Sequence, residues 1–90
     1  MADQEALQRL RESFVLQGAM ATLGAQLTHV APGEVDISFG WAPELTQQHG
    51  FIHAGMLSTA LDSACGYAGF SLMPADAGVL TIEFKINLLA

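Results

Sequence analysis

The chain has 90 residues, of which 51% are hydrophobic and 13% are charged, so it holds at most one domain and is too apolar to be disordered. Nine acidic residues against three basic ones give a formal net charge of −6, which excludes a general nucleic-acid-binding surface. No apolar run reaches the ~20 residues that cross a bilayer, so we expect no membrane partner. One small core cannot hide this much apolar surface, and part of it is expected to meet a protein partner.

Cysteine content and the N-terminal region bear on cellular location. Cys65 is the single cysteine, which excludes an intramolecular disulfide and a cysteine-rich metal site. The mildly apolar stretch that follows Arg11 is interrupted by Gln17 and Gly18, unlike the continuous apolar core of a signal peptide. We therefore expect a cytoplasmic protein.

The first half of the chain predicts a helix followed by a hairpin. Apolar residues recur at three- and four-residue spacing over residues 3–17, which is typical of an amphipathic helix, and Gly18 is expected to end it. Residues 25–30 are expected to form a short strand. The Pro-Gly pair that ends at Gly33 suits a type II turn, and the alternation over residues 35–41 predicts the second strand of the hairpin.

The second half predicts a loop, a second helix and a long strand. Residues 43–51 read as a loop, and residues 53–70 carry a helical apolar stripe. Asp62 lies off that stripe, among small side chains. Apolar and polar residues alternate over residues 79–88, which predicts a half-buried strand. Because that strand would form an exposed edge, we expect the chain to be a fragment or a truncated product of a larger sheet.

Most polar functional groups lie in the loop before the second helix and in its first turns. The start of this helix exposes backbone N–H groups, which together with the helix dipole stabilise a developing negative charge on a carbonyl oxygen. Asp62 follows two helical turns later. A carboxylate and an oxyanion site on one helix favour acyl transfer or hydrolysis.

The segment from Gln47 to Asp62 resembles the hotdog-fold acyl-CoA thioesterases of the phenylacetic-acid-degradation type. Their motif is an amide residue, then His-Gly-Gly, then an acid. Here His53-Ala54-Gly55 stands at the His-Gly-Gly position, Asp62 stands nine residues after the histidine, and Gln47 stands six before it. The resemblance implies an α+β hotdog fold, an antiparallel sheet wrapped around a central helix. Residues 1–90 would be the N-terminal part of a single such domain, truncated after the third strand.

The resemblance also implies a mechanism and a set of site residues. Asp62 would act as nucleophile or general base, the Ala54 N–H would stabilise the oxyanion, and Gln47 would position water or the carbonyl. The residues expected to contact substrate are His53, Gly55 and Ser58. The substrate would be a CoA thioester, with no cofactor and no metal, because a thiolate of reference pKa about 8.5 leaves readily.

The resemblance also bears on assembly, and the sequence departs from the motif at one position. The resemblance implies a homodimer or homotetramer in which the acid of one subunit faces the loop of another. Ala54 replaces the first glycine of the motif; alanine keeps the backbone N–H, but its methyl group narrows the approach to that donor.

The sequence leaves several alternatives open. Asp62 alone could be a structural carboxylate, and His49, His53 and Asp62 could form a two-histidine, one-carboxylate metal set, which the intervening glycine disfavours. Cys65 is expected to be a core residue rather than a nucleophile. The alternative function is a non-catalytic hotdog module that binds acyl-CoA or serves oligomerisation. A hotdog hydratase is disfavoured because His53 lies at the wrong end of the helix.

Overall fold

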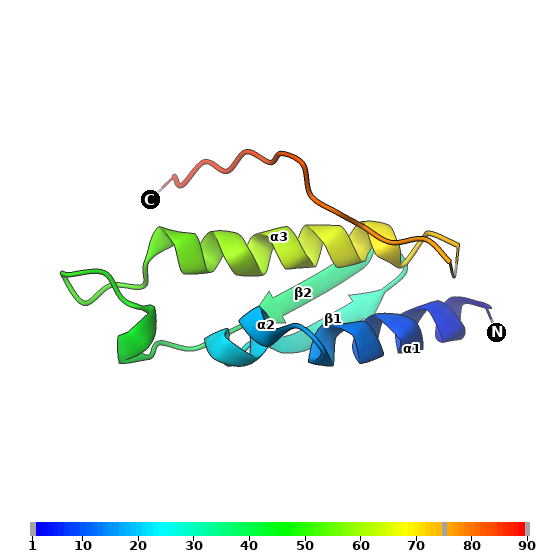
Figure 1. Cartoon of the computed structure of the whole chain (residues 1–90), viewed down its shortest axis with the longest axis horizontal. Helices are drawn as coiled ribbons and strands as arrows, with labels where there is room; N and C mark the ends of the chain where they lie inside the picture. Colours follow the sequence, from blue (N-terminus) through cyan, green and yellow to red (C-terminus); the bar gives the residue numbers. More distant parts are fainter. Residues whose placement is uncertain (1, 75, 90) are drawn as a thin grey trace.

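A computed structural model describes residues 2–74 and 76–89. The elements in chain order are helix α1 (Ala2–Val15), helix α2 (Gly18–Leu23), strands β1 (Gln26–Ala31) and β2 (Glu34–Ser38), the 3-10 helix η1 (Pro43–Leu45) and helix α3 (Ala54–Phe70). Helix α3 packs against β2 on one side and against α1 and α2 on another (Figure 1). The α+β composition is the one that the sequence predicts.

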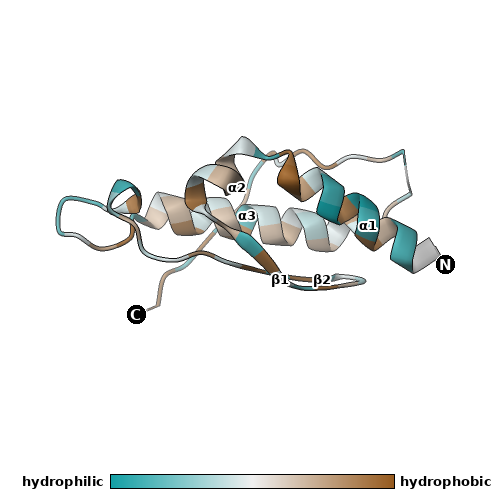
Figure 2. Cartoon of the chain, turned by 90° about the horizontal axis from the view of Figure 1, so that it is seen from below, coloured by the Kyte–Doolittle hydropathy of each residue, from teal (hydrophilic) through white to brown (hydrophobic). Residues whose placement is uncertain are grey.

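The first predicted helix is present but is followed by a second one. Helix α1 ends at Val15, and Gly18, expected to be a stop, is instead the first residue of α2. Gln17 between them has extended backbone angles, so the chain turns there. Hydrophilic and hydrophobic residues alternate along α1 in Figure 2, as they do on an amphipathic helix that covers a core.

The predicted hairpin is confirmed. Strands β1 and β2 pair antiparallel, with Leu27 opposite Ile37 and Val30 opposite Val35, and the register shifts between Leu27 and His29. Gly33 in the turn has a φ of +75°, which is the angle that a type II turn requires of its glycine. The second strand is shorter than expected, since pairing ends at Ser38.

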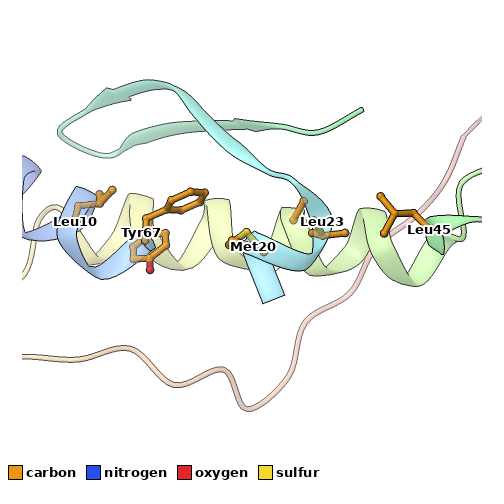
Figure 3. Packing of buried hydrophobic residues seen from close by; sticks show 7 residues of the cluster. Leu10, Met20, Leu23, Leu45 and Tyr67 are labelled. Atoms are coloured by element: carbon orange, nitrogen blue, oxygen red, sulfur yellow. The ribbon is translucent and has the colours of Figure 1, made fainter. Parts of the chain in front are cut away.

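A single hydrophobic cluster joins the helices. Figure 3 shows buried side chains from α1, α2 and η1 arranged along α3. Tyr67 of α3 lies between Phe14 and Phe70, with ring centroids 6.2 Å away on each side. The buried members are Leu10, Phe14, Met20, Leu23, Leu45, Ala60 and Tyr67. This packing fixes the position of α3 relative to α1 and therefore the position of the site described below.

The predicted strand over residues 79–88 is wrong. These residues run back along α3 in an extended form without strand pairing (Figure 1), and β1 and β2 form the only sheet in the described part of the chain. The side chains of Leu80 and Ile82 are 90% and 98% exposed. Alternation marks a segment suited to a sheet, but a strand also needs a neighbour for its backbone hydrogen bonds.

None of the described helices is long and apolar enough to cross a membrane.

Candidate active site

The loop before α3 is closed by its own backbone. Thr46 and Ile52 form an isolated antiparallel bridge, and the Gln47 N–H donates to the Phe51 carbonyl over 2.8 Å. The Gln47 side-chain oxygen accepts from the His49 N–H. The side-chain oxygen of Gln47 thus helps to hold the loop in place, while the two N–H groups of its side-chain amide have no hydrogen-bond partner among the described residues.

His53 caps the N-terminus of α3. Its Nδ1 accepts a 2.8 Å hydrogen bond from the Gly55 N–H, so the imidazole proton resides on Nε2. A Cβ atom at Gly55 would stand 3.0 Å from that Nδ1, so a side chain here would crowd the capping imidazole. Because Met56 donates to the His53 carbonyl, the Ala54 N–H is the first-turn donor without an acceptor in the described chain.

The Ser58 side chain is hydrogen-bonded to the N-terminal turn of α3 and not to Asp62. Its hydroxyl donates to the Ala54 carbonyl over 2.9 Å, within the helix. The structure thus brings together five of the predicted site residues at one end of α3: Gln47, His53, Ala54, Gly55 and Ser58.

Asp62 lies at a groove further along α3. Its side chain is partly exposed, and Oδ1 accepts a 2.8 Å hydrogen bond from the Thr81 hydroxyl. The groove has a volume of about 530 Å³ and runs between α1 and residues 78–81, with Gly66 and Phe70 along its length. A carboxylate that lines a groove is better placed to react with a ligand than a purely structural carboxylate is.

The wall of the groove opposite residues 78–81 is a hydrogen-bonded polar cluster. Gln17 donates from Nε2 to the Tyr67 hydroxyl over 2.7 Å and accepts from the Ser63 hydroxyl over 3.2 Å. Ser13 and Tyr67 hydroxyl oxygens are 3.1 Å apart. Sequence reasoning missed this cluster and Thr81. The detectable signal is the four-residue spacing of Ser13 and Gln17 within the first predicted helix and of Ser63 and Tyr67 within the second, although Gln17 lies beyond the end of α1 in the structure.

Asp62 and the helix N-terminus are separated within one chain. Eight residues of α-helix at about 1.5 Å each place Asp62 about 12 Å along the axis from Ala54. A thioester carbonyl is a single planar group, so one chain cannot present both the acid and the oxyanion donor to it. The two halves of the predicted site meet only if two copies of the chain contribute.

The remaining candidates from the sequence are a metal site and Cys65. Among the described residues, no group of three or more His, Cys, Asp and Glu side chains is placed to hold a metal. Cys65 was expected in the core, but it is exposed and lies at the edge of a groove between α3 and the β1–β2 hairpin.

A solved structure is similar to this one. It is the crystal structure of a thioesterase family protein from Silicibacter pomeroyi, with a TM-score of 0.91 and 55% sequence identity over 94% of this chain and 62% of that chain. The fold is thus the hotdog fold, as the sequence predicted. The likeness extends to thioesterases in general and not to the phenylacetic-acid-degradation type. No protein-family model matches the chain.

Two curated proteins are similar over part of the chain. MIOREX complex component 3 from Saccharomyces cerevisiae is 40% identical over 55 residues, 58% of this chain and 20% of the relative. An uncharacterized mitochondrial protein from Candida albicans is 41% identical over 56 residues, 59% of this chain and 25% of the relative. The chain therefore spans about a fifth to a quarter of these relatives. The expected cytoplasmic location is wrong, since the relative from Candida albicans is a mitochondrial protein.

Proposed function

We propose that this chain contributes to the active site of an acyl-CoA thioesterase, which hydrolyses acyl-CoA to the free acid and CoA. The observation that carries the proposal is the placement of Asp62 at the head of a groove, held by Thr81, on the same helix that offers an unpaired Ala54 N–H at its N-terminus. Likeness to a thioesterase family protein at 55% identity supports it.

Each group has a role in this reaction. Asp62 attacks the carbonyl carbon or removes a proton from the attacking water. The Ala54 N–H, at the positive end of the α3 dipole, donates to the oxygen that becomes negative. Gln47 has a side-chain amide N–H available for the carbonyl or the water. The CoA sulfur leaves as a thiolate, so no metal or cofactor is required.

The working site requires two copies of the chain. The separation of about 12 Å along α3 keeps Asp62 and the Ala54 N–H of one chain from reaching one carbonyl. In a homodimer or homotetramer, Asp62 of one copy faces the loop of another. Leu57 and Leu61 of α3 are 44% and 41% exposed, and this apolar surface is available for such a contact.

The remaining details concern substrate and location. His53, Gly55 and Ser58 line the approach to the oxyanion donor, and Gly55 contributes by having no side chain, since its N–H is used by His53. The acyl group is medium-sized or aromatic, as in the phenylacetic-acid-degradation type. From the mitochondrial relative we infer a mitochondrial location.

The first test is thiol release from a panel of acyl-CoA thioesters by the wild-type chain and by Asp62→Asn. Removing the general base should lower kcat by about 10²-fold or more, while thioester binding is largely retained. Asp36→Asn is the matched control, because Asp36 is an exposed carboxylate of β2. Near-normal turnover by Asp62→Asn would remove this residue from the mechanism. A folded wild-type chain that binds thioesters and releases no thiol would be the non-catalytic module.

The oxyanion donor can be deleted without disturbing the helix. Ala54 is the first residue of α3 and His53 before it is extended, with ψ of 133°, so both positions accept an Ala54→Pro change. Loss of the N–H should lower kcat by about 10²–10³-fold. Ala54→Gly keeps the N–H and should retain activity, and equal loss in both variants would reject the donor role.

A further inference from the structure

The polar wall of the Asp62 groove has hydrogen-bonding capacity left over. Gln17 uses one amide hydrogen for Tyr67 and its oxygen for Ser63, so one amide hydrogen is unused among the described residues. Ser63 donates its only hydroxyl proton to Gln17 and keeps its lone pairs as acceptors. The wall thus presents one free donor and one free acceptor side by side, both lining the groove.

These two groups are fixed in position. Gln17 sits at the bend between α1 and α2, where its own N–H donates to Phe14 and its carbonyl accepts from Met20. Ser63 is held by α3, directly after Asp62 in sequence. Tyr67 anchors the Gln17 amide from the buried core, where it is 7% exposed. A preorganised donor and acceptor pair discriminates between ligands more sharply than mobile side chains do.

We propose that Gln17 and Ser63 select acyl groups that carry a hydroxyl close to the thioester carbonyl. A hydroxyl accepts from the Gln17 N–H and donates to Ser63 Oγ, and so satisfies both groups at once. An unsubstituted acyl chain leaves both desolvated and unpaired, which is the arrangement that proteins discriminate against most strongly. Because Ser63 and Asp62 line the same groove, the hydroxyl lies near the reacting carbon. Among the described residues that line the groove, Asp62 has the one charged side chain, and so the acyl group is neutral.

This inference rests on the proposed thioesterase function for its substrate class. The test compares 3-hydroxyoctanoyl-CoA with octanoyl-CoA, by kcat/KM for thiol release and by calorimetric binding to Asp62→Asn. The wild-type chain should prefer the hydroxylated thioester by about tenfold or more, as expected for a hydrogen-bonding site that meets an analogue lacking its partner. In Gln17→Met, which keeps the length of the side chain without its amide, the preference should fall to about one.

The control is Gln8→Met, since Gln8 lies on α1, is exposed and, among the described residues, has a side chain that bonds only Glu12; this variant should keep the preference. If Gln17→Met fails to fold, Ser63→Ala takes its place and should lose the preference in the same way. Equal kcat/KM for the two thioesters in the wild type, or full preference in either folded variant, would overturn the inference. If neither thioester is hydrolysed, the proposed function fails, and the binding ratio alone decides: a preference supports the inference, while equal affinities or no binding overturn it.

Discussion

The Thr81 hydroxyl donates a 2.8 Å hydrogen bond to Oδ1 of Asp62, between residues 19 positions apart in the chain. It joins the extended C-terminal segment to the candidate catalytic acid. One lone pair of Oδ1 is thereby used, and Oδ2 has no hydrogen-bond partner among the described residues and can meet a carbonyl carbon or a water. The orientation of the carboxylate thus depends on a residue outside α3.

Thr81→Val should lower kcat for thiol release by about tenfold. A hydrogen bond to a charged group contributes about 1.5–3 kcal/mol, and solvent at this partly exposed site keeps the effect near the low end, where about 1.4 kcal/mol is tenfold in rate. Thr81→Ser keeps the hydroxyl and should restore most of the rate. Thr22→Val, which changes an exposed residue of α2, is the control and should leave kcat unchanged. A Thr81→Val rate equal to that of the wild type would show that the bond does not orient Asp62.

Gly55→Ala should stabilise the chain by about 1 kcal/mol less than Gly69→Ala does, because the gain in helix propensity is offset where the new methyl group crowds the His53 imidazole of the cap. Gly69→Ala is the matched change on the same helix. Its Cβ would stand 3.9 Å from Met73 Cε, an ordinary contact, so it should stabilise by up to about 1 kcal/mol. Urea unfolding of the two variants measures the difference. Equal stability of the two would mean that the His53 cap contributes nothing.

The local features of the fold could be predicted from the sequence because local interactions determine them. The Pro-Gly pair required a glycine at positive φ, and Gly33 adopts it. The helical stripe before Phe70 identified α3 to within one residue. The proximity of Gln47 to the start of α3 also follows from sequence, since a short loop joins it to His53, while the roles of these residues come from the resemblance and stay a prediction.

The remaining features depend on contacts between distant parts of the chain. Residues 79–88 have the alternation of a strand, but pairing needs an adjacent edge, which no local pattern specifies. The Thr81 bond to Asp62 and the Gln17 bond to Tyr67 join residues that are far apart in sequence. A two-residue bend at Leu16 and Gln17 places the Gln17 side chain toward α3, and helical periodicity does not predict where such a bend falls.

Gly33→Ala should destabilise the chain by about 1–2 kcal/mol, because an alanine at φ of +75° brings Cβ against its own backbone. The space around the site is not the cause, since the new Cβ would meet Leu72 at 3.4 Å, an ordinary contact. Gly18→Ala is the control, as no atom lies within 4 Å of its Cβ position and its φ is not positive. Thermal unfolding should give a lower Tm for Gly33→Ala only; a Tm equal to that of Gly18→Ala would contradict the strained turn.

Complementation between two inactive variants tests whether the site is shared between copies. Asp62→Asn has an intact oxyanion donor, and Ala54→Pro has an intact acid. In a mixed dimer, the acid of the Ala54→Pro copy faces the intact donor of the Asp62→Asn copy, so one of the two sites is complete. Random pairing of equal amounts makes half of the dimers mixed, and about a quarter of the wild-type activity should return. Co-expression followed by a thiol-release assay measures it.

The control replaces Ala54→Pro by the double variant Asp62→Asn/Ala54→Pro, which supplies no acid to either site and should restore nothing. The expectation that activity returns at all follows from the separation of about 12 Å between Asp62 and Ala54 along α3, which only a second copy can bridge. Absence of recovery from folded, mixed dimers would mean that both groups act from one chain. In that case α3 would have to bend or break between Ala54 and Asp62 when substrate binds, and this would appear as loss of helical circular dichroism on addition of a thioester to Asp62→Asn.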